Sequence, residues 1–144
     1  MTAREYLREI EQKRVQIGLL KAELEACYAS INLLPGVTYD GLHVQVSTDD
    51  SHVLSIVEEA TDKYKRLVAE IEEYEAARKE AFKTVREMEN KQHIKVLYLR
   101  YFEWMPWGRI AKRMGFKRDT NRAYQIHREA LKALNDILAK ETET

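Results

Sequence analysis

The chain has 144 residues, enough for one ordinary domain or two small ones, and it contains only five Gly and two Pro. With 33% of its residues charged and so few turn formers, its composition indicates long helices and argues against an extensive sheet. The single cysteine, Cys27, excludes an internal disulfide and a cysteine-rich metal site, and it fits a reducing compartment.

The formal net charge of zero hides a division within the chain. Residues 1–90 contain 12 Lys/Arg and 18 Asp/Glu, whereas residues 91–140 contain 12 Lys/Arg and 4 Asp/Glu. The first part is therefore acidic and the second basic. Such asymmetry points to a nucleic-acid-binding end.

The N-terminal segment is charged from Arg4 onward and lacks the apolar stretch of a signal peptide. No apolar run approaches the ~20 residues that a membrane-spanning helix needs. We therefore expect a cytoplasmic protein with no membrane partner.

The first predicted helix covers residues 3–34. Its apolar positions are separated by alternating steps of four and three, which places one stripe along one side of a helix and is typical of coiled coils. Only Lys13 interrupts the series, which consists of Tyr6, Ile10, Lys13, Ile17, Leu20, Leu24, Cys27, Ile31 and Leu34. Cys27 lies in this stripe, so we expect it to be a small buried hydrophobe and not a reactive thiol. Pro35 and Gly36 are expected to end the helix.

The second predicted helix covers residues 51–90, with Asp49, Asp50 and Ser51 as capping residues. Its stripe contains one charged member, Arg78, among Val53, Val57, Ala60, Tyr64, Leu67, Ile71, Tyr74, Arg78, Ala81, Val85 and Met88. The simplest arrangement of residues 1–90 is a long antiparallel coiled-coil hairpin.

The connection between these helices, residues 35–50, is longer than the ~2–8 residues usual between paired helices. Its apolar residues alternate with polar ones, which predicts a short extended piece packed over the tip of the hairpin. These apolar residues are Val37, Tyr39, Leu42, Val44 and Val46. Whether this ordered loop has a function or is only a cap is left open.

Further apolar residues flank the two stripes, and a bare hairpin would leave them in water. They are Leu7, Leu19, Ile56, Val68 and Phe82. A second copy of the chain or the basic part of the same chain could cover them. We expect a homodimer formed through the hairpin rather than a monomer.

The basic part, residues 91–140, predicts three helices. Ile94, Leu97, Tyr98, Tyr101 and Phe102 indicate a helix over 91–103, and Pro106 suits the first position of a short helix over 106–114. Gly115 supplies a tight turn, Phe116 fills the core behind it, and Asp119 or Thr120 caps the third helix. The buried stripe of that helix is expected at Ala123, Ile126, Ala130, Leu134 and Ile137.

This order of elements is that of a helix-turn-helix, whose second helix enters the DNA major groove. Arg, Asn and Gln can form paired hydrogen bonds with base edges, so the candidate base-reading residues are Asn121, Arg122, Tyr124 and Gln125. Lys and Arg fix the position of the protein on the phosphates, and the candidate phosphate-binding residues are Lys112, Arg113, Lys117, Arg118, Thr120 and Arg128. His127 is expected to be a surface or phosphate contact.

The sequence contains no pattern typical of an enzyme. It has no Gly-rich phosphate loop and no Cys-x-x-Cys pair, and its histidines are scattered at positions 43, 52, 93 and 127. We therefore expect no catalysis, no cofactor, no metal site and no small-molecule substrate.

Residues 98–103, the pattern Trp107-x-x-Ile110-Ala111-x-x-Met114-Gly115 and the closing Ala130-Leu131-x-x-Leu134 resemble region 4 of bacterial sigma factors. Together with the opening residues 2–7 and the loop residues 35–40 and 44–47, the whole chain resembles the sigma-region-4-like transcriptional regulators of Gram-positive phages and prophages, of the ArpU and RinA type. The resemblance implies a regulator of late or packaging genes that binds promoter DNA, with host RNA polymerase as a further candidate partner. Between Gly115 and Ala130 this chain has two residues more than the usual sigma spacing, and the extra length falls in residues 117–120.

Three hypotheses are therefore weighed. The first is a sequence-specific, double-stranded-DNA-binding transcription regulator with a coiled-coil arm. The second is a DNA-packaging component similar to a phage small terminase, for which ring-shaped oligomers with weak sequence preference would speak. The third is a coiled-coil interaction adaptor whose basic part is only structural, for which a lack of salt-dependent DNA binding would speak.

Overall fold

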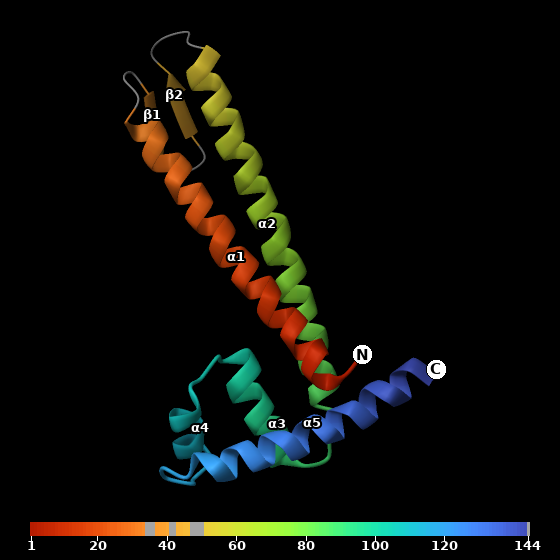
Figure 1. The fold of residues 1–144 in the computed structure, drawn as a ribbon. Coiled ribbons are helices and arrows are strands. Elements are labelled where there is room, and N and C mark those ends of the chain that lie inside the picture. The colour runs from red at the N-terminus through yellow and green to blue at the C-terminus, as the bar shows by residue number, and fades with distance from the viewer. Residues whose placement is uncertain (34–36, 41–42, 47–50, 144) are drawn as a thin grey trace. The chain divides into compact units, whose positions relative to one another are not determined.

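The computed structural model describes residues 1–33, 37–40, 43–46 and 51–143 (Figure 1). Helices dominate this part of the chain, as the composition predicts. The helices are α1 (Ala3–Asn32), α2 (Ser51–Val85), α3 (Lys91–Leu97), α4 (Trp107–Arg113) and α5 (Thr120–Glu143), with a π-helical turn, η1 (Tyr98–Phe102), after α3. Two short strands, β1 (Val37–Asp40) and β2 (His43–Val46), lie between α1 and α2. Within the described residues, no helix combines the length and the apolar character needed to cross a membrane.

The chain forms two compact units. The arm unit is Lys13–Tyr74, and the head unit combines Met1–Gln12 with Glu75–Thr144. The sequence suggested a division at residues 90 and 91 instead. The difference arises because the outer ends of both long helices contribute to the head unit: Leu7 is fully buried there, and the Ala3 N–H donates to Oδ1 of Asn135 over 2.6 Å.

In the arm unit, α1 and α2 lie side by side and run in opposite directions (Figure 1). Lys13 Nζ near the start of this part of α1 lies 3.7 Å from Oε2 of Glu73, while Ile31 near its end packs in one cluster with Val53. Between these ends, a second cluster contains Ile17, Leu20, Leu24 and Leu67. Lys13, the one charged member of its stripe, is thus placed at the edge of the core in an ion pair. That pair is exposed and contributes ~0–1 kcal/mol.

A reciprocal cap begins α1. The hydroxyl of Thr2 accepts the Glu5 N–H over 3.2 Å, and Oε2 of Glu5 accepts the Thr2 N–H over 3.1 Å. This capping box satisfies two of the N–H groups that a helix start leaves without partners. The predicted stop at Pro35 and Gly36, and the predicted capping by Asp49, Asp50 and the Ser51 side chain, lie outside the described residues.

Strands β1 and β2 pair in an antiparallel register that matches Val37 with Val46 and Tyr39 with Val44. The extended piece predicted from the alternation of apolar residues is therefore present. The sequence also predicts that this piece packs over the tip of the hairpin, but its side chains lie outside the described part of the structure.

Helix α2 ends at Val85 and does not reach the predicted Asn90. Its last turn tightens, with the Met88 N–H donating to the Val85 carbonyl over 3.2 Å. Asn90 instead caps α3, because its Oδ1 accepts the N–H of Gln92 over 2.9 Å and that of His93 over 3.4 Å. An Asn side chain in this position favours a helix start, so α3 begins here as a separate helix.

The predicted single helix over 91–103 is interrupted by η1. The Glu103 N–H donates to the Tyr98 carbonyl over 3.0 Å, five residues back, so this turn is wider than an α-turn. The rings of Tyr98 and Phe102 stack with centroids 6.0 Å apart, and both contact Phe82 of α2, at 5.2 and 5.5 Å. The guanidinium of Arg78 lies 5.6 Å from the centre of the Phe102 ring.

These contacts explain two irregular features of the sequence. Arg78, the charged member of its stripe, faces an aromatic ring, and Phe82 is partly covered by η1 of the same chain. Leu19 and Val68 of the arm unit, by contrast, remain 57% and 37% exposed.

We predict that Leu67→Ala lowers the free energy of unfolding by about 2–4 kcal/mol, because it leaves a cavity in the buried cluster of the arm unit. The neighbouring Val68→Ala removes a more exposed side chain and should change stability by less than about 0.5 kcal/mol. Urea unfolding followed by circular dichroism measures both. Equal effects of the two substitutions would contradict the assignment of this core.

Candidate nucleic-acid interface

Helix α4 has one buried and one basic face. Ile110 and Ala111 are fully buried, while Arg109, Lys112 and Arg113 are exposed on the opposite side at helical spacing. Pro106 is the residue before this helix, with an extended ψ of 151°, and Trp107 begins it. The prediction that Pro106 is the first helical residue is thus wrong by one position.

A glycine turn ends α4. The Phe116 N–H donates to the Ala111 carbonyl over 2.8 Å and the Gly115 N–H to the Lys112 carbonyl over 3.1 Å, which is the pattern of a Schellman motif. Gly115 has a φ of 84°, a conformation that glycine adopts without steric cost. Nothing lies within 4 Å of the position where a Cβ would be, so the turn requires glycine for its backbone and not for space.

A second turn separates Gly115 from α5. The Asp119 N–H donates to the Phe116 carbonyl over 2.9 Å, and Lys117 between them has a φ of 54°. Oδ1 of Asp119 then accepts the Arg122 N–H over 3.2 Å. Of the two predicted caps of α5, Asp119 is the one that forms this bond.

Helix α5 presents two opposite faces. The inner face contains the predicted Ala123, Ile126, Ala130 and Leu134, together with His127 and Leu131, whereas the predicted Ile137 is half-buried. Residues separated by four, three and four positions line the outer face: Asn121, Gln125, Arg128 and Lys132 are all exposed. Lys132 was not predicted as a site residue, although the same helical spacing would have found it.

An aromatic cluster fixes α4 and η1 against α5. Oη of Tyr101 and Nε2 of His127 share a hydrogen bond of 2.7 Å, and their rings stack. The Trp107 ring lies 4.9 Å from the His127 ring and 4.5 Å from the Tyr124 ring, measured between centroids. The Arg100 guanidinium covers the Trp107 ring at 5.0 Å. Three elements of the head unit therefore meet through side chains that the sequence alone did not connect.

His127 is buried, which corrects its prediction as a surface or phosphate contact. Burial, together with the positive charges of Arg4, Arg100 and Arg128, lowers the pKa of its imidazole to about 4. The residue is thus neutral at physiological pH. Its role is to orient α5 through Tyr101 and Trp107.

Two of the predicted base-reading residues also have contacts within the head unit. The Arg122 guanidinium lies 4.6 Å from the centre of the Phe116 ring, and Tyr124 packs on Trp107 while remaining 37% exposed. Asn121 and Gln125 are exposed on the outer face of α5.

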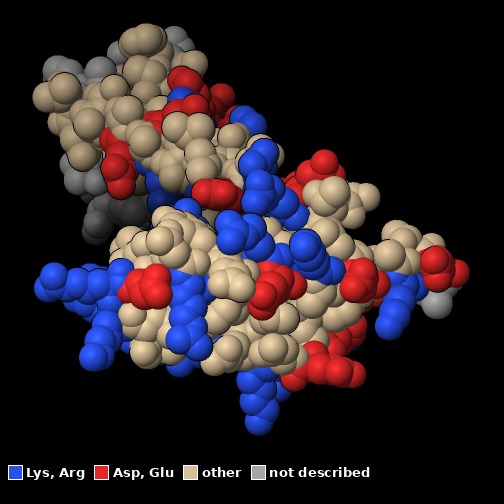
Figure 2. Space-filling view, turned by 60° about the horizontal axis from the view of Figure 1, so that its bottom comes forward, with Lys and Arg blue, Asp and Glu red and all other residues tan. Residues whose placement is uncertain are grey.

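Five of the six predicted phosphate-binding residues lie at the junction of α4 and α5, whereas Arg128 lies on the outer face of α5 beside Gln125. Lys112 and Arg113 end α4, Lys117 and Arg118 form the turn, and Thr120 begins α5 as a half-buried residue. Residues 107–128 contain seven Lys/Arg and one acidic residue, Asp119. In Figure 2, Lys and Arg side chains gather at the end of the head unit that carries this junction, at the left of the view.

Lys95 and Arg109 also belong to this region and were not predicted. Nζ of Lys95 donates to the Arg113 carbonyl over 2.9 Å, at the C-terminal end of α4, where a positive charge is favourable. Lys95 and Arg113 are 18 residues apart in the sequence, so no local sequence pattern predicts this contact. Arg109 completes the exposed basic face of α4.

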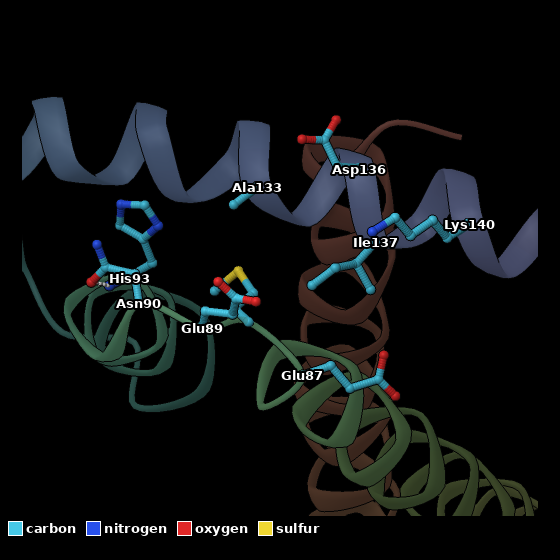
Figure 3. A pocket seen from close by; sticks show the side chains of 9 residues that line it. Glu87, Glu89, Asn90, His93, Ala133, Asp136, Ile137 and Lys140 are labelled. Carbon is cyan, nitrogen blue, oxygen red and sulfur yellow. Dashed lines mark hydrogen bonds between the residues drawn. The ribbon is translucent and has the colours of Figure 1, made fainter.

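A hollow of about 410 Å³ lies elsewhere in the head unit, between residues 87–90 and the second half of α5. Figure 3 shows Ile137 of α5 reaching toward residues 87–90. Glu87, Glu89 and Asp136 line it, so it is unsuited to phosphate. Within the described part of the chain, no group of three or more His, Cys, Asp or Glu side chains is placed to hold a metal ion.

Comparisons with protein-family models, with curated proteins and with solved structures found no match. The resemblance to sigma region 4 and to the phage regulators stays a prediction.

We predict opposite effects of alanine at two glycines. Gly115→Ala should destabilise the head unit by about 1–2 kcal/mol, because its backbone conformation is unfavourable for any residue with a Cβ. Gly108→Ala, inside α4 with open space around it, should stabilise the unit by roughly 0.5–1 kcal/mol. Thermal unfolding of the two variants and of wild type measures these changes in stability. Destabilisation by Gly108→Ala would contradict the placement of α4.

We also predict a pH dependence of stability that originates from His127. Because its folded pKa, about 4, lies below the value of 6.5 in the unfolded chain, the unfolded state binds the additional proton as pH falls. The free energy of unfolding should therefore decrease by about 1–2 kcal/mol between pH 6.5 and pH 5.

His127→Gln retains a hydrogen-bonding group beside Tyr101 but does not titrate, so it serves as the control. Its stability should vary much less over the same pH range. If wild type and variant lose the same free energy of unfolding between pH 6.5 and pH 5, the assignment of His127 as a neutral, buried imidazole is wrong.

Proposed function

We propose that the protein binds double-stranded DNA sequence-specifically through a helix-turn-helix formed by α4 and α5. In this arrangement the first half of α5 lies in the major groove, and α4 crosses above it near the backbone. The protein acts as a transcription regulator, and the arm unit is a coiled coil that serves oligomerisation. The proposal assigns no catalytic role.

The outer face of the first half of α5 is the observation that carries this proposal. Asn121, Gln125 and Arg128 point away from the buried stripe of the same helix and are exposed. Amide and guanidinium groups can each form two hydrogen bonds with the edge of one base, adenine for Asn and Gln, guanine for Arg. A face of this kind, preceded by a capped turn, suits base recognition better than a merely solvated surface.

The cations beside this face support phosphate binding next to the groove. Arg109, Lys112 and Arg113 extend from α4, and Lys117 and Arg118 extend from the turn. Lysine and arginine that neutralise phosphates release counterions, which supplies affinity without sequence preference. Base contacts then provide the specificity.

The resemblance to sigma region 4 supports a role at promoters, with host RNA polymerase as a candidate partner, and the resemblance to phage and prophage regulators supports a late or packaging gene as the target. The longer turn at residues 117–120 changes how α5 approaches the groove relative to the sigma pattern. For this reason the base contacts are assigned from the exposed face of α5 in this chain.

Gln125→Ala should weaken binding to the preferred sequence by about 1–3 kcal/mol and relax the preference at one base position. Gln92→Ala makes the same chemical change at an exposed position of α3 and should leave affinity and preference unchanged. Fluorescence anisotropy with the preferred duplex and its single-base variants measures both. Identical behaviour of the two variants would remove Gln125 from the reading face.

Lys112→Gln should weaken binding to every duplex alike and reduce the slope of log affinity against log salt by about 0.9, the value expected for one lost phosphate contact. Lys79→Gln removes an exposed charge from α2 and should leave the slope unchanged. If the two variants show the same slope, the basic junction of α4 and α5 is not a phosphate-binding surface.

A further inference from the structure

Helix α1 carries a second apolar stripe, which no part of the described chain covers. Its members are separated by four, three, four, three and four positions: Val15, Leu19, Ala22, Ala26, Ala29 and Leu33, the last immediately after the helix. All six are exposed, and the larger ones are exposed by 56%, 57% and 85% for Val15, Leu19 and Leu33. We call this set the outer stripe.

The outer stripe lies opposite the face of α1 that packs on α2. At 100° per residue, its mean direction is about half a turn away from that of the buried Ile17, Leu20 and Leu24. None of its six members is charged, in a chain of which 33% is charged. Apolar positions on both sides of one helix are expected when a second helix covers each side.

The spacing identifies the kind of occupant. A 3.5-residue period keeps a stripe in contact with another helix along its whole length, here ~27 Å from Val15 to Leu33. The three central members are alanine, which allows two helix backbones to approach closely, and the ends carry Val and Leu. Identical helices that stay in contact along the stripe, with the closest backbone approach at Ala22–Ala29, match this distribution of sizes.

We propose that the outer stripe is a homodimer interface in which α1 of one copy packs in parallel against α1 of a second copy. This deepens the oligomerisation assigned to the arm unit and, in its consequences for DNA, rests on the proposed function. Parallel packing pairs each member with its own counterpart, so that the two large ends meet and the small residues meet at the centre. It also brings the two N-terminal ends of α1 together.

The charges beside the outer stripe decide between the two directions. In parallel packing, Gly18 lies beside the partner's Glu23 and Glu25 beside the partner's Ser30, so no like charges meet. The antiparallel register that uses the whole stripe would instead place Glu23 beside the partner's Glu23 and Glu25 beside the partner's Glu25. Like charges at such positions are unfavourable.

The first test compares one substitution at two exposed alanines of the arm unit. Ala26→Glu places a charge in the outer stripe and should raise the dimer dissociation constant roughly 100-fold or more. Ala69→Glu makes the same change on the exposed side of α2 and should leave the dimer intact. Light scattering should give twice the chain mass of 17.0 kDa for wild type and Ala69→Glu, and 17.0 kDa for Ala26→Glu at the same concentration.

A wild-type mass of 17.0 kDa, or an unchanged dimer in Ala26→Glu, would overturn the proposal. Circular dichroism of both variants should match wild type, because both positions are exposed in the single chain. A loss of helix in Ala26→Glu is checked with Leu19→Ala, which shortens an exposed side chain without adding charge and should weaken the dimer while keeping the helices.

The second test concerns direction and uses the full chain with Cys27→Ala. Val15→Cys should form an intermolecular disulfide rapidly under oxidised glutathione, because parallel packing brings the two Cα atoms to within about 7 Å. Antiparallel packing would separate them by ~27 Å and allow cross-linking only between Val15→Cys and Leu33→Cys chains. Preferential formation of this mixed disulfide would overturn the parallel arrangement.

DNA binding separates this proposal from the proposed function. Ala26→Glu should retain the salt-dependent binding of a single head unit and lose the preference for two inverted half-sites. A wild-type protein that is dimeric but binds no DNA would refute the proposed function and leave the proposed interface intact. A wild-type protein that is monomeric and binds a single DNA site would refute the interface and leave the proposed function intact.

Discussion

The contact of the neutral His127 ring with Tyr101 and Trp107 is the interaction on which the head unit depends. It joins α5 to η1 and to α4 at one point, and the Arg100 guanidinium closes the cluster over Trp107. The imidazole is uncharged, so Arg4, Arg100 and Arg128 can lie near it without repulsion from a buried positive charge. With α4 and α5 fixed in this way, the basic side of α4 and the outer face of α5 are held in one relative position, which a groove-binding surface requires.

The turn between these helices shows how local and tertiary determinants combine. Gly115 is required by its backbone conformation and could be assigned from the sequence alone, whereas Asp119 was one of two predicted caps and the structure selects it. The position of the turn relative to the core depends on Phe116 and on Lys95, which reaches the end of α4 from α3. A loop of this length tolerates Lys117 in a left-handed conformation, a cost of about 1–2 kcal/mol that the surrounding bonds offset.

Periodicity predicted the long helices because a stripe of 3.5-residue spacing has few other interpretations, and Pro106, Gly115 and Asp119 located α4 and α5 to within a residue or two. The same periodicity misplaced the end of α2, since Met88 continues the stripe and is buried although it lies beyond the helix. Nothing local foretold η1, which depends on Phe82 receiving two rings from it, or the burial of His127, which depends on a partner 26 residues away. The exposed site residues were predictable because helical spacing alone assigns them to the outer face, whereas their packing partners were not.

Selection of bound duplexes from random DNA, with the mass of each complex recorded, tests the central claim most directly. The account predicts a short consensus, present as two inverted copies in complexes that contain two protein chains, and the loss of one base preference when Gln125 is replaced by alanine. If ring-shaped oligomers bind DNA without enriching any sequence, a role in DNA packaging is favoured instead. Failure to retain any DNA at low salt would contradict the account and leave the head unit a structural module.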